Sequence, residues 1–156
     1  MSMRKHILLV EDDPNDVELI REGLKESQLA LEITVAHDGA EALNYLFCRD
    51  GFAARPPVNP AFVILDLKLP KIDGMEVLRQ IKADDKLKTI PVVVLTSSQE
   101  ERDLVQSYRR GVNAYVVKPV DFDEFLGVVK EMGMFWATIN VPPPGDQPHN
   151  SAIDPR

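Results

Sequence analysis

Short apolar runs recur along the chain and are separated by longer segments of mixed polarity. Each run is too short for a buried helix and suits a strand. The predicted strands span residues 6–10, 31–36, 62–66, 90–96 and 114–118. Residues 31–36 alternate between apolar and polar, whereas 62–66 and 90–96 are almost continuously apolar. Continuous runs are typical of parallel strands that are covered on both faces.

Apolar residues recur at helical spacing in the segments between these strands, which indicates amphipathic helices. The helices are predicted within residues 11–28, 37–50, 73–84, 97–111 and 121–139. The expected capping groups at the first four starts are Asp13 before Pro14, Asp38 with Glu41, Asp73 with Glu76, and Ser97 or Ser98. Gly111 is expected to end the fourth helix.

Strands that alternate with helices predict an α/β fold, a doubly wound parallel sheet with right-handed crossovers. The 156 residues suit one domain, which we expect over residues 1–140. The connection at 51–61 is rich in Gly and Pro and is longer than most. Residues 141–156 are proline-rich and are expected to form a disordered tail.

Composition excludes several classes of protein. The net charge of −7 argues against binding to nucleic acid, because that affinity comes largely from Lys and Arg. No segment approaches the roughly 20 apolar residues of a membrane span, so no membrane partner is expected. Cys48 is the single cysteine, which rules out an internal disulfide and fits a reducing, cytoplasmic location.

Residues that can handle charge follow four of the predicted strands. Glu11 and Asp12 come after the first strand, Asp66 ends the third, Thr96 ends the fourth and Lys118 ends the fifth. Any one of them alone is more simply explained as a helix cap or a surface residue. Ligands bind at the carboxyl ends of strands in such sheets, and the coincidence at one edge therefore points to a site.

The three acids Glu11, Asp12 and Asp66 would repel one another strongly if they converge. Each close pair costs about 4 kcal/mol at about 4 Å with an effective dielectric near 20. Lys118 offsets part of this charge, and Mg²⁺, which prefers oxygen ligands and retained waters, could offset more. A carboxylate beside a cation, a hydroxyl and a lysine suits phosphoryl transfer, with Asp66 as the nucleophile and Thr96 as a hydrogen-bond donor.

The segments "LLVEDD", "VILDLKLPKIDG", "VVLTS" and "YVVKP" stand in the order and spacing of a known family. Over roughly residues 5–137 the chain resembles a response-regulator receiver domain, the phosphoacceptor of a two-component relay. The resemblance implies a flavodoxin-like (βα)5 fold with strand order 2-1-3-4-5. It also implies a protein that catalyses only its own phosphorylation and dephosphorylation, rather than an enzyme with a separate substrate.

The resemblance also implies a role for each matching residue in metal binding. Asp66 would be the phosphorylated residue and would share a Mg²⁺ ion with the acidic pair. Asp12 would bind the ion directly, Glu11 would act mainly through water, and the backbone carbonyl of Lys68 would complete the protein ligands.

Three further residues match the family's switch. Thr96 would be the switch hydroxyl, Tyr115 the aromatic residue that changes rotamer with it, and Lys118 the lysine that contacts the phosphoryl group. The Lys118–Pro119 bond is cis in relatives, and this sequence is compatible with a cis bond.

The long loop 48–60, the segment "IPVVVLTSS" and the "FWATI" end of the last helix resemble the small receivers paired with bacterial phytochromes. This resemblance implies a sensor histidine kinase, a photoreceptor, as the phosphate donor. With no DNA-binding output domain, the signal would pass to an unknown downstream protein or phosphotransfer partner.

A homodimer through the 99–139 face is also expected. Six apolar residues could pair two chains there or could instead belong to the core: Leu104, Val105, Tyr108, Phe122, Phe125 and Trp136.

Three other functions compete with this interpretation. A Mg²⁺-dependent phosphatase with an aspartyl nucleophile generally has a second acid two residues later, where this chain has Lys68. A receiver that is never phosphorylated and acts only as a scaffold would not need the full acidic set. A nucleotide or flavin binder is discounted because no G-x-G-x-x-G follows the first strand.

Overall fold

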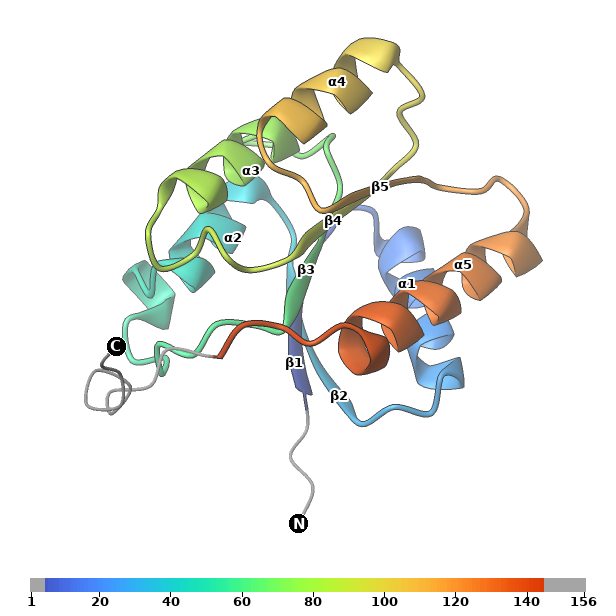
Figure 1. Ribbon diagram of the computed structural model, residues 1–156, viewed down its shortest axis with the longest axis horizontal. Coiled ribbons are helices and arrows are strands. Elements are labelled where there is room, and N and C mark those ends of the chain that lie inside the picture. The colour runs from blue at the N-terminus through green and yellow to red at the C-terminus, as the bar shows by residue number, and fades with distance from the viewer. Residues whose placement is uncertain (1–4, 145–156) are drawn as a thin grey trace.

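The computed structural model describes residues 5–144 and has a central five-stranded parallel sheet (Figure 1). The strands are β1 (Lys5–Val10), β2 (Leu31–Ala36), β3 (Phe62–Leu65), β4 (Val92–Thr96) and β5 (Ala114–Val117). Their order across the sheet is β2-β1-β3-β4-β5, with every neighbouring pair parallel. The doubly wound flavodoxin-like architecture and its strand order are therefore confirmed.

Helices cover both faces of the sheet. They are α1 (Pro14–Glu26), α2 (Gly39–Leu46), α3 (Gly74–Ala83), α4 (Glu101–Arg109) and α5 (Phe122–Met134). Helices α2, α3 and α4 lie on one side, and α1 and α5 pack together on the other (Figure 1). Helix α5 continues into a π-helix over Phe135–Ile139. The described residues contain no helix long and apolar enough to cross a membrane.

Alternate residues of each inner strand point to opposite faces, which divides the core into two clusters. On β1, Leu8 and Val10 join the cluster under α2 and α3, whereas Ile7 and Leu9 join the cluster under α1 and α5. Strands β3 and β4 are buried along their whole length. Burial on both faces explains why these segments are almost continuously apolar.

All three expected aspartate caps are confirmed. Asp13 accepts from the amides of Asn15 and Asp16, Asp38 accepts from the amide of Glu41, and Asp73 accepts from the amide of Glu76. Each satisfies backbone donors that the first turn of a helix leaves without partners.

The expected start of the fourth helix is wrong. Helix α4 begins at Glu101, and its N-cap position is held by Glu100 without a side-chain hydrogen bond. Neither Ser97 nor Ser98 caps it. The side chain of Ser98 is instead used in a buried network beside β4, so the chain leaves the strand through a short loop before the helix starts.

The loop 48–60 is ordered around one arginine. Arg55 donates to the carbonyls of Tyr45, Pro56 and Val58, and its guanidinium lies 4.1 Å from the centroid of the Tyr45 ring. The residues that line the adjoining hollow of about 570 Å³ include His6 and Tyr45, and these two share a hydrogen bond of 2.6 Å. The loop is therefore an ordered segment that packs beside His6, near the start of β1.

Two further expectations concern the backbone. The sequence is compatible with a cis Lys118–Pro119 bond, but no peptide bond within residues 5–144 is cis, and trans is the commoner isomer for X–Pro bonds. The expected domain end at residue 140 follows the π-helix directly, and residues 145–156 of the expected tail lie outside the described residues.

Candidate functional site

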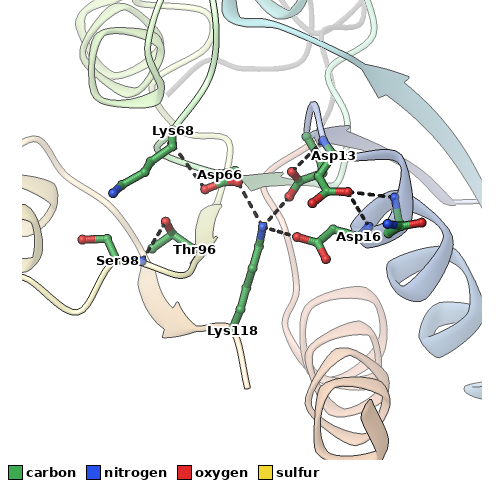
Figure 2. A network of polar contacts seen from close by, with 9 residues as sticks. Asp13, Asp16, Asp66, Lys68, Thr96, Ser98 and Lys118 are labelled. Atoms are coloured by element: carbon green, nitrogen blue, oxygen red, sulfur yellow. Dashed lines mark hydrogen bonds and ion pairs between the residues drawn. The ribbon is translucent and has the colours of Figure 1, made fainter. Parts of the chain in front are cut away.

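The ends of four parallel strands bring the site together. Glu11 and Asp12 follow β1, and Asp66 follows β3. Thr96 ends β4, and Lys118 follows β5. Because all five strands run in the same direction, these residues meet at the carboxyl edge of the sheet, as Figure 2 shows for Asp66, Thr96 and Lys118. The expected convergence of these side chains is therefore present.

Three carboxylates form an oxygen-rich cluster. Glu11, Asp12 and Asp66 each offer an oxygen, and these oxygens lie within 4.8 Å of one another. Glu11 and Asp66 are buried, whereas Asp12 is exposed. Hard oxygen donors with one side open to water suit a divalent cation such as Mg²⁺, which keeps part of its hydration shell. The residues therefore fit the metal that the sequence indicates.

Lys118 is the counter-charge of this cluster. Its Nζ lies 2.8 Å from Glu11 Oε1, 2.7 Å from Asp16 Oδ2 and 3.0 Å from Asp66 Oδ2 (Figure 2). The side chain of Lys118 is only 9% exposed, so these contacts are weakly screened by solvent. One ammonium group therefore holds three carboxylates that come from two strand ends and a helix.

Sequence reasoning missed Asp16. The residue lies in the first turn of α1, four positions before the buried Ile20, and so on the side of the helix that faces the sheet. That spacing is present in the sequence, but Asp16 does not directly follow a strand, and strand ends are what locate ligands in such a sheet. With Asp16 included, the site has four acids, and three of them contact Lys118.

Burial and charge shift the ionisation of two groups. Burial raises the pKa of Glu11 to about 7; the negative charge of Asp66 adds to this rise, and the hydrogen bond from Lys118 opposes it. For Lys118, burial lowers the pKa, but hydrogen bonds to Asp16 and Glu11 and the charges of Asp66 and Glu11 outweigh it and raise the pKa overall. Lys118 therefore stays cationic at neutral pH.

Two hydrogen bonds position Asp66 at the end of β3. Its amide donates to the carbonyl of Val10 at 3.0 Å, and its Oδ1 accepts from the amide of Lys68 at 3.3 Å. Helix α3 starts against the same backbone because Gly74 lacks a side chain. A Cβ at Gly74 would lie 2.2 Å from the carbonyl oxygen of Asp66. The side chain of Lys68 is exposed, away from this packing.

The hydroxyl of Thr96 and the ring of Tyr115 are both connected to Ser98. Thr96 is fully buried, and its Oγ1 accepts from the amide of Ser98 at 3.3 Å. The hydroxyl of Tyr115 donates to the carbonyl of Ser98 at 3.1 Å. Burial raises the pKa of Tyr115, which keeps its hydroxyl protonated and able to donate. Ser98 is a contact of the site that sequence reasoning assigned only to helix capping.

Comparisons with known proteins agree with this geometry. The family model for the response regulator receiver domain matches residues 7–130. The response regulator Rcp1 of Synechocystis sp. is 40% identical over 139 residues, which cover 88% of this chain and 93% of Rcp1. A solved Mn²⁺-bound form of Rcp1 has a TM-score of 0.84 and covers 89% of this chain and 99% of the solved one.

Two further solved structures are phytochrome response regulators. The phosphorylated cyanobacterial phytochrome response regulator RcpA is 40% identical, with a TM-score of 0.86 and coverage of 90% of this chain and 99% of that one. The bacteriophytochrome response regulator RtBRR is 55% identical, with a TM-score of 0.73 and coverage of 91% and 86%. The chain therefore belongs to the response regulator receiver domain family and is similar to its phytochrome-associated members.

Proposed function

We propose that this chain accepts a phosphoryl group on Asp66 from a sensor histidine kinase. The observation that carries the proposal is the contact between Lys118 Nζ and Asp66 Oδ2 inside the acidic cluster. An oxygen of Asp66 attacks the phosphorus of a phosphohistidine, the P–N bond breaks and the imidazole leaves, so that an acyl phosphate forms. Lys118 then neutralises charge on the transferred oxygens.

The metal ligands of the proposal are Glu11, Asp12 and Asp66, with the backbone carbonyl of Lys68. A bound Mg²⁺ ion would add positive charge beside the phosphoryl oxygens. Asp12 is exposed and can bind the ion directly, whereas Glu11 is buried and hydrogen-bonded to Lys118, which suits an indirect role. The Mn²⁺-bound form of the relative Rcp1 supports a divalent ion in this family.

The proposed switch runs from Asp66 through Thr96 to Tyr115. A phosphoryl group adds up to about two negative charges and draws the Thr96 hydroxyl towards it. Thr96 and Tyr115 are both hydrogen-bonded to Ser98, so a shift of Thr96 can change the position of Tyr115. Phosphorylation would bias an equilibrium between two arrangements of the surface formed by residues 99–139.

The proposed partners follow from the chain's relatives and its surface. RcpA and RtBRR are named as phytochrome response regulators, which supports a photoreceptor histidine kinase as the donor. The signal would leave through protein contacts of the 99–139 face, either with a second copy of the chain or with a downstream protein.

The test is incubation with Mg²⁺ and acetyl phosphate, followed by measurement of the intact mass. We expect a gain of one phosphoryl group in the wild type, and no gain in Asp66→Asn or when the ion is removed with EDTA. Lys68→Gln is a suitable control, because its exposed side chain lies near the site and its backbone carbonyl is retained. An unchanged wild-type mass would contradict the proposal, and turnover of phosphomonoesters would favour the phosphatase.

A further inference from the structure

Helix α4 is held to the rest of the molecule by few contacts. Its N-cap lacks a side-chain hydrogen bond, and Ser107 is its one buried residue. The hydroxyl of Ser107 is itself buried and has no hydrogen-bond partner within the described residues. Leu104, Val105 and Tyr108 of the same helix are exposed. With so little burial, the position of α4 depends strongly on the contacts at its start.

One of those contacts is a short hydrogen bond from Ser98. The Ser98 hydroxyl lies 2.6 Å from Asp103 Oδ2, and Asp103 stands in the first turn of α4. Ser98 is 4% exposed, so solvent screens this bond weakly. The charged acceptor makes it stronger than a bond between neutral groups. The same hydroxyl accepts from the amide of Glu100 at 3.3 Å, which ties the N-cap to the same atom.

The backbone of Ser98 connects to the site at the same time. Its amide donates to Thr96 Oγ1, and its carbonyl accepts from the hydroxyl of Tyr115. Any residue except proline could make these two backbone contacts, whereas the bond to Asp103 requires a side-chain donor. Figure 2 shows Thr96 and Ser98 side by side near Asp66. Ser98 therefore connects Thr96 at the end of β4 with the start of α4.

We propose that Ser98 is a positioning residue that transmits the phosphorylation state of Asp66 to α4 through its bond to Asp103. When Thr96 moves towards the phosphoryl group, its bond to the Ser98 amide shifts the loop. Only one rotatable bond separates the Ser98 backbone from its hydroxyl. A shift of the loop is therefore passed to the carboxylate of Asp103. Asp103 remains near the N-terminus of α4, where the helix dipole favours negative charge, and the helix follows it.

The inference rests on the proposed function of Asp66, and the experiment separates the two. Hydrogen exchange of residues 101–109 is measured by mass spectrometry with and without Mg²⁺ and acetyl phosphate. The intact mass of each sample gives the phosphorylated fraction, and exchange is compared at equal fractions. The chains compared are wild type, Ser98→Ala, Asp103→Ala and the double variant. Asp103→Asn is included because its amide oxygen can still accept, and Glu101→Ala is the control in the same turn.

Without phosphate, we expect Ser98→Ala and Asp103→Ala to exchange roughly tenfold faster than wild type at the start of α4, since each loses a hydrogen bond to a charged group. The double variant should speed exchange by clearly less than the product of the two single effects, because the bond between Ser98 and Asp103 is lost in both single variants and can be lost only once. With phosphate, the wild type should change its exchange in α4. Both alanine variants should lose most of that change, Asp103→Asn should recover part of it, and Glu101→Ala should respond as wild type does.

Two results would overturn the inference alone: phosphorylated Ser98→Ala and Asp103→Ala responding in α4 as fully as wild type, or Glu101→Ala losing as much of the response as Asp103→Ala. If one variant fails to fold, the other still decides, because the two lie at opposite ends of the bond. A wild type that gains no phosphoryl mass would overturn the proposed function and this transmission together.

Discussion

Lys118 shows how much of the site depends on a single side chain. Its ammonium group is the one cation among the described residues that contacts Glu11, Asp16 and Asp66. Removing one partner of a buried ion pair is costly because the charges left behind have neither water nor a counter-ion. In this cluster Glu11, Asp16 and Asp66 would be left together without their counter-charge.

Replacing Lys118 with methionine should therefore lower the free energy of unfolding by about 3 kcal/mol. Urea unfolding at pH 7.5 without divalent ions measures the difference. Lys88→Met is the matched control: Lys88 pairs with Asp85 at 3.2 Å, but both side chains are exposed. Removing such a pair should cost less than about 1 kcal/mol. Similar losses in the two variants would show that Lys118 does not compensate the cluster.

The residues of the site were predictable to the extent that strand ends locate them. Glu11, Asp12, Asp66, Thr96 and Lys118 could be found because parallel strands end at one edge. Asp16 reaches the site from a helix, where an acid in the first turn ordinarily signals only a favourable dipole. Ser98 had a simpler explanation as a cap, and only its contacts with Thr96 and Asp103 reveal its place.

At the scale of elements, the most extensive contact between two helices of the described residues is between α1 and α5. Gly23 of α1 faces Val129 of α5, and a Cβ at Gly23 would lie 2.8 Å from the Val129 Cβ. Real Cβ atoms do not approach so closely, so a side chain at this position would push the two helices apart.

Gly23→Ala should lower the free energy of unfolding by about 1–3 kcal/mol through overpacking. Gly127→Ala is the control within α5, because a Cβ there meets nothing within 4 Å. It should stabilise the protein by up to about 1 kcal/mol, since alanine favours helix over glycine. Thermal and urea unfolding of the two variants should shift in opposite directions. A shift in the same direction would mean that the α1–α5 contact is looser than described.

Element boundaries were predictable from the sequence where burial alone decides them. The continuous apolar runs predicted β3 and β4 to within two residues, because a buried strand must be apolar along its length. The start of α4 was less predictable: the chain after β4 offers Ser97 and Ser98 as caps, and tertiary contacts of Ser98 override this local preference.

At the scale of the whole molecule, α4, β5 and α5 form one edge with several exposed apolar residues (Figure 1). Of the six apolar residues considered for a dimer surface, Phe125 belongs to the core and Trp136 is partly buried against it. The other four are exposed by 39% or more: Leu104, Val105, Tyr108 and Phe122. These four are the side chains that a second copy of the chain could cover.

If the chain forms a dimer through this edge, Leu104→Asp should weaken self-association at least about tenfold, because burying an unpaired carboxylate opposes contact. Sedimentation velocity with and without acetyl phosphate measures the change. Val58→Asp is the control, since Val58 is similarly exposed at 42% but lies in the 48–60 loop. Equal weakening by both, or by neither, would place the dimer contact elsewhere.

The π-helix at Phe135–Ile139 ends α5 with two large apolar side chains turned outward. Its wider turn is marked by the amide of Asn140 bonding to the carbonyl of Phe135, five residues back. The buried residues Phe125, Val129, Gly133 and Ala137 lie four apart, so the inward face of α5 continues into this turn with ordinary helical spacing. Phe135 and Ile139 lie off this face and are 44% and 66% exposed. Because the inward face keeps its spacing, the turn leaves Phe135 and Ile139 as a small apolar surface at the end of α5.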